Sequence, residues 1–311
     1  MSFVRTVLSD VPSDCLGYCY SHEHIVLRGE YIEDAFPDFN LTDMDAICHE
    51  LIDLRECGVC TMIDAMPTDA GRSVADLVEA SRRTGMHIVA STGLHLRQYY
   101  PPVHWYDTIP EDDLFNRMVV EIEMGMTDPG SGRSPSRAGV TKVAGSLDRL
   151  TDLEVRNFRA AGRAQALTGC PILTHTERGT AALEQIQILK DAGADLEHVA
   201  LSHLDQKPDI DYHREVLQSG VKLEFDSSFR WKGDPNHTLE LLIQLAPEYP
   251  RSFLLGMDAA KPRYWSSFGG EPGLTFLIGE FASRLLDQGL DRDLVRRFFV
   301  ENPAETYSFG R

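Results

Sequence analysis

Short apolar runs alternate with amphipathic stretches along most of this chain. Residues 44–55 carry apolar side chains at helical spacing, and Gly58 follows where a C-terminal cap is expected. An apolar run rich in β-forming residues, 59–64, comes directly afterwards. This pattern predicts a helix that leads into a buried strand.

The same alternation repeats through residue 258. Strands are expected at residues 17–24, 59–64, 87–91, 139–144, 171–175, 199–203, 221–226 and 253–258. Helices are expected at residues 44–55, 74–83, 112–124, 152–168, 180–192, 212–219 and 239–245. Because alternating strands and helices form parallel β-α-β units, eight such strands predict a closed (β/α)8 TIM barrel, a fold of roughly 250 residues.

The barrel prediction covers residues 1–311 as a single domain, with the extra length in loops. Residues 99–110 follow the third strand, and the Gly-, Ser- and Pro-rich residues 128–136 precede the fourth. A doubly wound open sheet is the alternative. It is disfavoured because no G-x-G-x-x-G turn follows an early strand.

Acidic residues outnumber basic ones by 48 to 30, which gives a formal net charge of −18. This charge argues against general binding to nucleic acid or to an anionic membrane surface, so an anionic ligand needs a local basic cluster. No apolar run reaches the ~18 residues of a membrane span, and the first residues lack the basic-then-apolar plan of a signal peptide. We therefore expect a cytoplasmic protein with no membrane or nucleic-acid partner.

Six cysteines are scattered along the chain in a way that does not resemble a secreted disulfide framework. Cys57 and Cys60 form a C-x-x-C pair, which favours redox chemistry when its first cysteine begins a helix. Here the pair ends a predicted helix and enters a strand. Buried thiols are therefore favoured over a redox pair.

Histidines gather at the carboxyl ends of the predicted strands. His22 and His24 lie two residues apart in an extended segment, so both imidazoles are expected on one side while Glu23 turns to the other. Such a pair is half of a metal site, because neutral imidazole is a common metal ligand. Three more candidates end other strands: His175, His203 and Asp258. Since the carboxyl ends of barrel strands share the active-site face, we expect these side chains to converge.

Lys142 lies within the fourth predicted strand, in Val-Thr-Lys-Val-Ala. The chain also has His-Glu-His at the end of strand one, His175 in Thr-His-Thr, His203 in Ser-His-Leu-Asp and Asp258 in Gly-Met-Asp. Together these motifs resemble the phosphotriesterase family of the amidohydrolase superfamily. The resemblance runs from residue 6 to residue 306 and includes six ligand positions in order.

This resemblance implies an amidohydrolase-like barrel with a binuclear metal centre. The ligands are then His22, His24 and Asp258 for one ion and His175 and His203 for the other. A carboxylated Lys142 and a hydroxide bridge the ions, because a neutral lysine amine reacts with carbon dioxide to give an anionic carbamate; an ion-paired interior lysine is the alternative. Asp258 takes the proton of the attacking hydroxide. Zinc is the default metal for such ligands, with Mn, Co, Ni and Fe left open.

The loops after the last two strands carry a local basic cluster. Arg230 and Lys232 follow strand seven, and Lys261 and Arg263 follow strand eight, among aromatic neighbours. In an acidic protein such a cluster is a candidate anion site, and phosphate sites are frequent on these loops of TIM barrels. Solvated surface charge is the alternative.

Within the family, these loops are similar to those of the branch that hydrolyses sugar lactones with a terminal phosphate. The resemblance implies phosphate binding by Lys232, Lys261 and Tyr264, with Arg230 and Arg263 as auxiliaries. Lys261 departs from the arginine that is usual there, so phosphate would be held without bidentate geometry. His95 departs from the tyrosine of Thr-Gly-x-Tyr, which puts the contact to the substrate carbonyl in question.

The expected function is hydrolysis of a lactone, in particular a phosphorylated sugar γ-lactone, by attack of the metal-bridging hydroxide. Another hydrolase on the same centre, acting on organophosphate triesters, aryl esters or N-acyl amino acids, is the main alternative. A non-catalytic binding role and an isomerase or lyase are further alternatives. The expected partner is a small anionic lactone, and since family members are often dimers, a homodimer is also expected.

Overall fold

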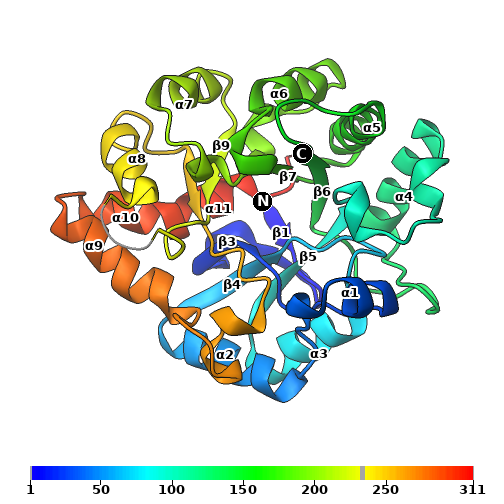
Figure 1. Ribbon diagram of the computed structural model, residues 1–311, viewed down its shortest axis with the longest axis horizontal. Coiled ribbons are helices and arrows are strands. Elements are labelled where there is room, and N and C mark those ends of the chain that lie inside the picture. Colours follow the sequence, from blue (N-terminus) through cyan, green and yellow to red (C-terminus); the bar gives the residue numbers. More distant parts are fainter. Residues whose placement is uncertain (1, 232–234, 311) are drawn as a thin grey trace.

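Within residues 2–231 and 235–310, which the computed structural model describes, eight parallel strands form the centre of the molecule with helices around them (Figure 1). The barrel strands are β3 (Tyr18–Glu23), β4 (Val59–Asp64), β5 (His87–Gly93), β6 (Val140–Gly145), β7 (Ile172–Thr176), β8 (Val199–Ser202), β9 (Lys222–Phe225) and β10 (Phe253–Leu255). Each strand pairs with the next one in the chain. This sequential order excludes the doubly wound sheet and confirms the (β/α)8 barrel.

The helices pack on the outside of the strands. They are α1 (Glu30–Ala35), α2 (Met44–Glu56), α3 (Val74–Thr84), α4 (Glu111–Glu123), α5 (Asp152–Thr168), α6 (Ala182–Asp191), α7 (Ile210–Leu217), α8 (His237–Leu245), α9 (Ala282–Asp287), α10 (Arg292–Phe299) and α11 (Glu301–Thr306). The seven predicted helices correspond to α2 through α8. The short α1 and the three helices after β10 were not predicted, because the helix-to-strand repeat ends at the last strand.

Side chains alternate between the barrel interior and the helix layer, as the period of a strand requires. In β5, Val89 belongs to the inner cluster while Ile88 packs with the helices. Leu173 and Ile172 divide in the same way in β7. Tyr307, beyond α11, joins the inner cluster and donates a hydrogen bond to the Ser21 oxygen at 2.9 Å. The chain's last segment therefore completes the barrel core.

The barrel closes between its last and first strands. The backbone N–H of Asp258 donates to the carbonyl oxygen of His22 at 3.0 Å. Glycine is needed beside this contact, because a Cβ at Gly256 would lie 2.7 Å from the same His22 oxygen and 2.8 Å from Glu224 Oε1. This close approach brings the segment after β10 against the end of β3.

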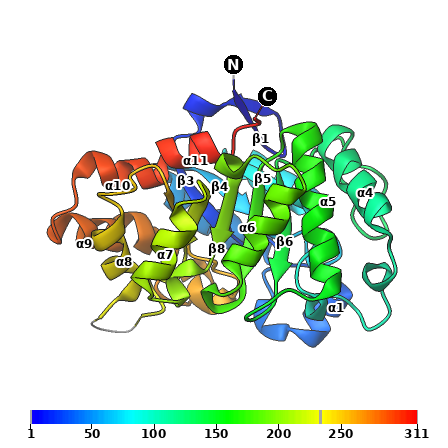
Figure 2. The same cartoon turned by 90° about the horizontal axis from the view of Figure 1, so that it is seen from above.

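The two ends of the barrel have different roles. Both termini and the unpredicted hairpin of β1 (Phe3–Arg5) and β2 (Asp10–Pro12) lie at one end (Figure 2). Helix α1, which follows β3, lies at the opposite end, where the strands finish. That end is free to carry the loops of a site. No helix in the described parts of the chain is long and apolar enough to cross a membrane.

All six cysteines lie in the described residues and are free. Burial raises the pKa of the Cys170 thiol to about 12, so this thiol is inert. The prediction of buried thiols is wrong for the C-x-x-C pair: Cys57 is exposed because it follows the last turn of α2 at the surface, and Cys60 in β4 is partly exposed.

A buried arginine fastens the loops around β4 and β5. The guanidinium of Arg72 donates to both carboxylate oxygens of Glu121, each at 2.9 Å, and to Asp128 Oδ1 at 2.9 Å. Asp128 Oδ2 also accepts the backbone N–H of Val74 at 2.5 Å. The predicted loop at residues 128–136 is thus anchored at its first residue.

Replacing Arg72 is expected to destabilise the fold. Arg72→Met leaves the Glu121 carboxylate buried without its charge partner, which costs about 3–5 kcal/mol of unfolding free energy. Denaturant unfolding followed by circular dichroism measures this loss. Arg83→Ala is the matched control, because its ion pair with Asp45 lies at the surface and little change is expected. Equal stability of both variants would contradict a structural role for Arg72.

Candidate metal centre

The first strand presents its histidines as alternation predicts. His22 lies in β3 and His24 one residue beyond its end, and both side chains line the same cavity. Glu23 between them faces the other way, where its carboxylate accepts the backbone N–H groups of Met257 at 2.8 Å and Ala259 at 3.2 Å. Glu23 therefore ties the end of β3 to the loop after β10.

The other candidates come from the ends of three more strands. His175 lies in β7, whereas His203 directly follows β8 with a φ of 66°. Asp258 lies three residues beyond β10 with a φ of 47°, so the expected strand at residues 253–258 is too long. This left-handed backbone is costly for residues other than glycine and is held by the surrounding contacts.

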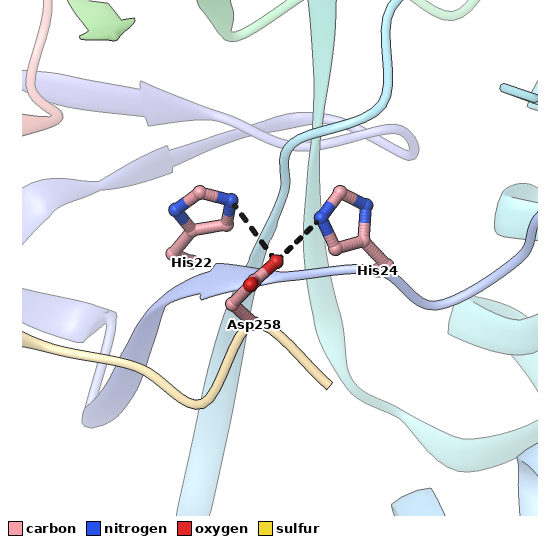
Figure 3. Close-up of side chains that lie close together, drawn as sticks. All are labelled: His22, His24 and Asp258. Atoms are coloured by element: carbon pink, nitrogen blue, oxygen red, sulfur yellow. Dashed lines mark hydrogen bonds and ion pairs between the residues drawn. The ribbon is translucent and has the colours of Figure 1, made fainter. Parts of the chain in front are cut away.

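Three side chains converge closely at the mouth of the barrel. Figure 3 shows the carboxylate of Asp258 between the rings of His22 and His24. Oδ1 of Asp258 lies 2.9 Å from His24 Nε2 and 3.8 Å from His22 Nε2. Their candidate ligand atoms all lie within 4.8 Å of one another, a spacing suited to one metal ion.

Two buried carboxylates behind the histidines were missed in the sequence. Oδ2 of Asp226 lies 2.7 Å from His203 Nδ1 and 3.7 Å from His22 Nδ1. Oε2 of Glu224 lies 3.3 Å from the same His22 nitrogen. Glu224 and Asp226 are two residues apart at the end of the seventh barrel strand, so the alternation that singled out His22 and His24 was also available to find them.

These carboxylates orient the imidazole rings. A metal-ligating histidine ordinarily gives its second nitrogen to a carboxylate or carbonyl, which fixes the ring and its tautomer. His22 fits this rule, because its Nδ1 faces Glu224 and the Ser202 hydroxyl at 2.8 Å while its Nε2 faces Asp258. His203 also has a carboxylate, Asp226, at its Nδ1.

His175 lies on the far side of this group. Its ring centroid is 4.5 Å from that of His203 and 5.2 Å from that of His95. Oε2 of Glu177, another residue that the sequence did not single out, lies 3.1 Å from His175 Nε2. His175 thus also pairs one nitrogen with a carboxylate, which leaves Nδ1 available.

Lys142 lies in β6, fully buried. Its Nζ has no hydrogen-bond partner among the described residues. Burial lowers the pKa of Lys142 to about 8, which favours the neutral amine more than in water. An interior lysine without a partner is costly unless something else meets it.

Burial also sets the charge of the candidate ligands. It lowers the pKa of His175 to about 4 and that of His22 well below its usual range, so both rings are neutral near pH 7. Burial likewise opposes a charged His203, but the adjacent Asp226 carboxylate raises its pKa overall. Burial would raise the pKa of Asp258, yet Arg230 and His24 hold it well below the usual range. Neutral imidazoles and an ionised carboxylate are the forms that bind metal.

The cavity above these residues has a volume of about 290 Å³ and a mixed lining. Its cations are Arg178, Arg230 and Lys261, with Tyr264 close to the last two. Its apolar side chains are Leu27, Phe39, Met66, Tyr99 and Ala260, and the Phe39 ring centroid lies 5.0 Å from Lys261 Nζ. Of the other predicted substrate contacts, His95 also lines the cavity, Arg263 instead contacts the Tyr264 hydroxyl at 2.9 Å, and Lys232 lies outside the described residues.

The donor set fits divalent metal. Imidazole nitrogens and a carboxylate suit Zn and its first-row neighbours, and the unpartnered Lys142 amine beneath them is a site that a bridging group would satisfy. A TIM barrel with these donors at the carboxyl ends of its strands is typical of the metal-dependent hydrolases.

Comparison with known proteins gives the family. The sequence profile described as the phosphotriesterase family matches residues 2–307. The chain is similar to a phospho-furanose lactonase of Mycoplasmopsis agalactiae, with 32% identity over 99% of this chain and 92% of the relative. The chain therefore belongs to the phosphotriesterase family and is a metal-dependent hydrolase.

Solved structures agree with this assignment. A lactonase from Listeria monocytogenes superposes with a TM-score of 0.93 at 32% identity, covering 99% of this chain and 100% of the other. The phosphotriesterase homology protein of Escherichia coli, complexed with phosphate in its active site, superposes with a TM-score of 0.87 at 29% identity, over 94% of this chain and 99% of that one.

Loss of the Asp226 carboxylate is expected to weaken metal binding. Asp226→Asn removes the charge that orients His203, and such changes typically lower metal affinity about 10–100-fold. Competition with a chelating dye measures the affinity. Asp53→Asn is a matched control, because its carboxylate lies 3.8 Å from a histidine, His49, at the surface. If Asp226→Asn bound metal as tightly as the control, His203 would not depend on this contact.

Proposed function

We propose that this protein is a lactonase that opens a phosphorylated sugar γ-lactone with the help of two divalent metal ions. The observation that carries the proposal is a single cavity that is lined both by the candidate metal donors and by Lys261. The phospho-furanose lactonase relative and the lactonase structure support the reaction class. A substrate with a hydrolysable ring ester and a separate anionic group matches both parts of the cavity.

In this proposal the two ions share the histidines as the family resemblance implies. His22, His24 and Asp258 would hold one ion, His175 and His203 would hold the other, and a carboxylated Lys142 would serve as a ligand to both. The buried, unpartnered Lys142 amine supports this role, because a carbamate would satisfy it with two cations. Bound divalent ions lower the pKa of water and polarise a carbonyl oxygen, and zinc is the default choice.

The chain's own residues bind the substrate and move its protons. Asp258 lies at the meeting point of the donors and is suited to accept a proton from the attacking water and deliver it to the ring oxygen that leaves. Tyr99 and Phe39 provide an apolar surface for one face of the sugar ring and exclude water. His95, 5.2 Å from His175 between ring centroids, lies where it can contact the lactone carbonyl.

Lys261 is placed to meet the substrate anion. It lines the cavity, and among the described residues the carboxylate oxygen in contact with its Nζ is Asp38 Oδ2, at 3.6 Å. Tyr264 lies beside it, and burial would raise the pKa of its hydroxyl, but Arg263 and Arg230 lower that pKa overall. A hydroxyl polarised in this way is a good hydrogen-bond donor to a phosphate. Lys232 remains a proposed third contact.

A panel of γ- and δ-lactones with and without a terminal phosphate tests the proposal. A pH-indicator assay follows the acid released on ring opening, and the phosphorylated γ-lactones are expected to have the highest kcat/KM. Aryl esters, organophosphate triesters and N-acyl amino acids belong in the same panel. Faster hydrolysis of any of these than of every lactone would overturn the proposal, and product mass distinguishes hydrolysis from isomerisation.

Lys142→Ala is expected to abolish turnover and to release most of the bound metal, because the bridging anion is lost. Metal analysis of the purified protein and the lactone assay measure the two effects. A small carboxylic acid such as propionate is expected to restore part of both by occupying the vacated space. Lys222→Ala, which removes another buried barrel lysine at the start of β9, is the control. Full metal content and full activity in Lys142→Ala would contradict the proposal of a binuclear centre bridged by this lysine.

Lys261→Ala is expected to raise KM for a phosphorylated lactone about tenfold or more, the typical worth of a hydrogen bond to a charged group. The KM for the same lactone without its phosphate changes much less. Steady-state kinetics on the pair of substrates measures the difference. Lys190→Ala on the exposed face of α6 provides the control. An equal effect of Lys261→Ala on both substrates would remove Lys261 from the anion site.

A further inference from the structure

We infer that Arg230 is a positioning residue that clamps Asp258. It does not bind the substrate anion, which is the role that its place in a basic loop predicts. The inference deepens the proposed function and rests on it, since Asp258 is the proposed metal ligand and proton acceptor. It concerns a side chain that lines the cavity yet is turned toward the protein.

One terminal nitrogen of Arg230 donates two hydrogen bonds to Asp258. Nη2 donates to the side-chain Oδ2 at 2.8 Å and to the backbone oxygen of the same residue at 2.7 Å. Oδ1, the other carboxylate oxygen, faces His24 Nε2 at 2.9 Å. The carboxylate is therefore held from its outer side by the arginine while its inner oxygen points at the metal donors.

The second terminal nitrogen of Arg230 contacts the first residues of its own loop. Nη1 donates to the backbone oxygen of Asp226 at 3.2 Å, and lies 3.4 Å from both Asp226 Oδ1 and the Ser227 hydroxyl. Asp226 is the carboxylate beside His203. The Arg230 guanidinium thus links Asp226, the carboxylate beside His203, to Asp258, the carboxylate beside His22 and His24.

Aromatic rings fix the plane of this guanidinium. Its central carbon lies 4.9 Å from the ring centroid of Phe229 and 5.9 Å from that of Tyr264. Stacking of this kind favours arginine over lysine, because only the planar guanidinium can stack and donate two parallel sets of hydrogen bonds. The side chain is 27% exposed, so most of its surface is committed to these contacts.

Asp258 needs such a clamp more than an ordinary ligand does. Its backbone is in the left-handed region, with a φ of 47°, three residues beyond the end of β10. Strand pairing therefore does not hold its side chain in place. Lys261 offers the contrast, because among the described residues its ammonium contacts one carboxylate, that of Asp38 at 3.6 Å, and it lines the cavity. We therefore assign Lys261 to the substrate and Arg230 to the metal ligand Asp258.

Kinetics with paired substrates separate positioning from anion binding. Arg230→Ala is expected to lower kcat about 10–100-fold for the phosphorylated lactone and for its unphosphorylated counterpart alike, with little change in KM, as loss of a group behind a metal ligand typically does. Added guanidinium ion is expected to restore part of the kcat of Arg230→Ala. Arg230→Lys is expected to be impaired on both substrates, because a lysine cannot reproduce the two-sided contact. Arg251→Ala, at an exposed ion pair with Glu305, is the control.

A readout independent of turnover tests the same contact. In the protein loaded with Co²⁺, Arg230→Ala is expected to change the visible absorption spectrum and to lower Co²⁺ affinity, and guanidinium ion is expected to reverse both changes. Circular dichroism of the variant checks that the fold is kept. A rise in KM confined to phosphorylated lactones, with an unchanged Co²⁺ spectrum, would overturn the inference and return Arg230 to the anion site.

The two proposals fail in different ways. If the unaltered protein hydrolyses no lactone, the proposed function falls, while the Co²⁺ spectrum and affinity still decide whether Arg230 positions Asp258. If lactones are hydrolysed and Arg230→Ala keeps its kcat and its spectrum, only the positioning role falls.

Discussion

Asp258 takes part both in the closure of the barrel and in the candidate metal site at its mouth. Its backbone N–H bonds the His22 carbonyl oxygen at 3.0 Å and so fastens the segment after the last strand to the first strand. Its carboxylate then reaches His24 Nε2 at 2.9 Å. Because both contacts belong to one residue, the candidate metal donors can meet only in a closed barrel. If the barrel opened between β10 and β3, His22 and His24 would be separated from the Asp258 carboxylate.

Buried acids hold the loops that leave the strands. Glu23 accepts two backbone N–H groups of the loop after β10, and Asp64 accepts those of Ile25 at 2.8 Å and Met66 at 3.1 Å. Burial raises the pKa of Asp64 to about 6, although these hydrogen bonds favour its ionised form. A buried carboxylate is costly unless it is bonded in this way. The acids therefore specify where the backbone runs around the site.

The cavity combines charged and apolar side chains in one lining. In a chain with a net charge of −18, an anionic ligand is attracted only where cations gather locally. In the proposed function, Lys261 and Tyr264 form such a place beside the candidate metal donors, and the Phe39 ring lies against the Lys261 ammonium at 5.0 Å. Arg230 lines the same cavity, yet its charge is already balanced by Asp258 and Asp226. A count of basic residues therefore overstates how much positive charge the substrate meets.

The sequence by itself determined the barrel and the positions of the candidate metal donors. The helix-to-strand repeat predicted all eight strands, and His22, His24, His175 and His203 were found because the ends of parallel strands share one face. The added hairpin and the last three helices lay outside that repeat. Only the tertiary structure decided which partner each charged side chain meets. Arg230 is four residues from Asp226 and 28 from Asp258, yet its ion pair with Asp258 is the shorter one, 2.8 Å against 3.4 Å. Barrel closure, which no local pattern encodes, brings the loops of Arg230 and Asp258 together.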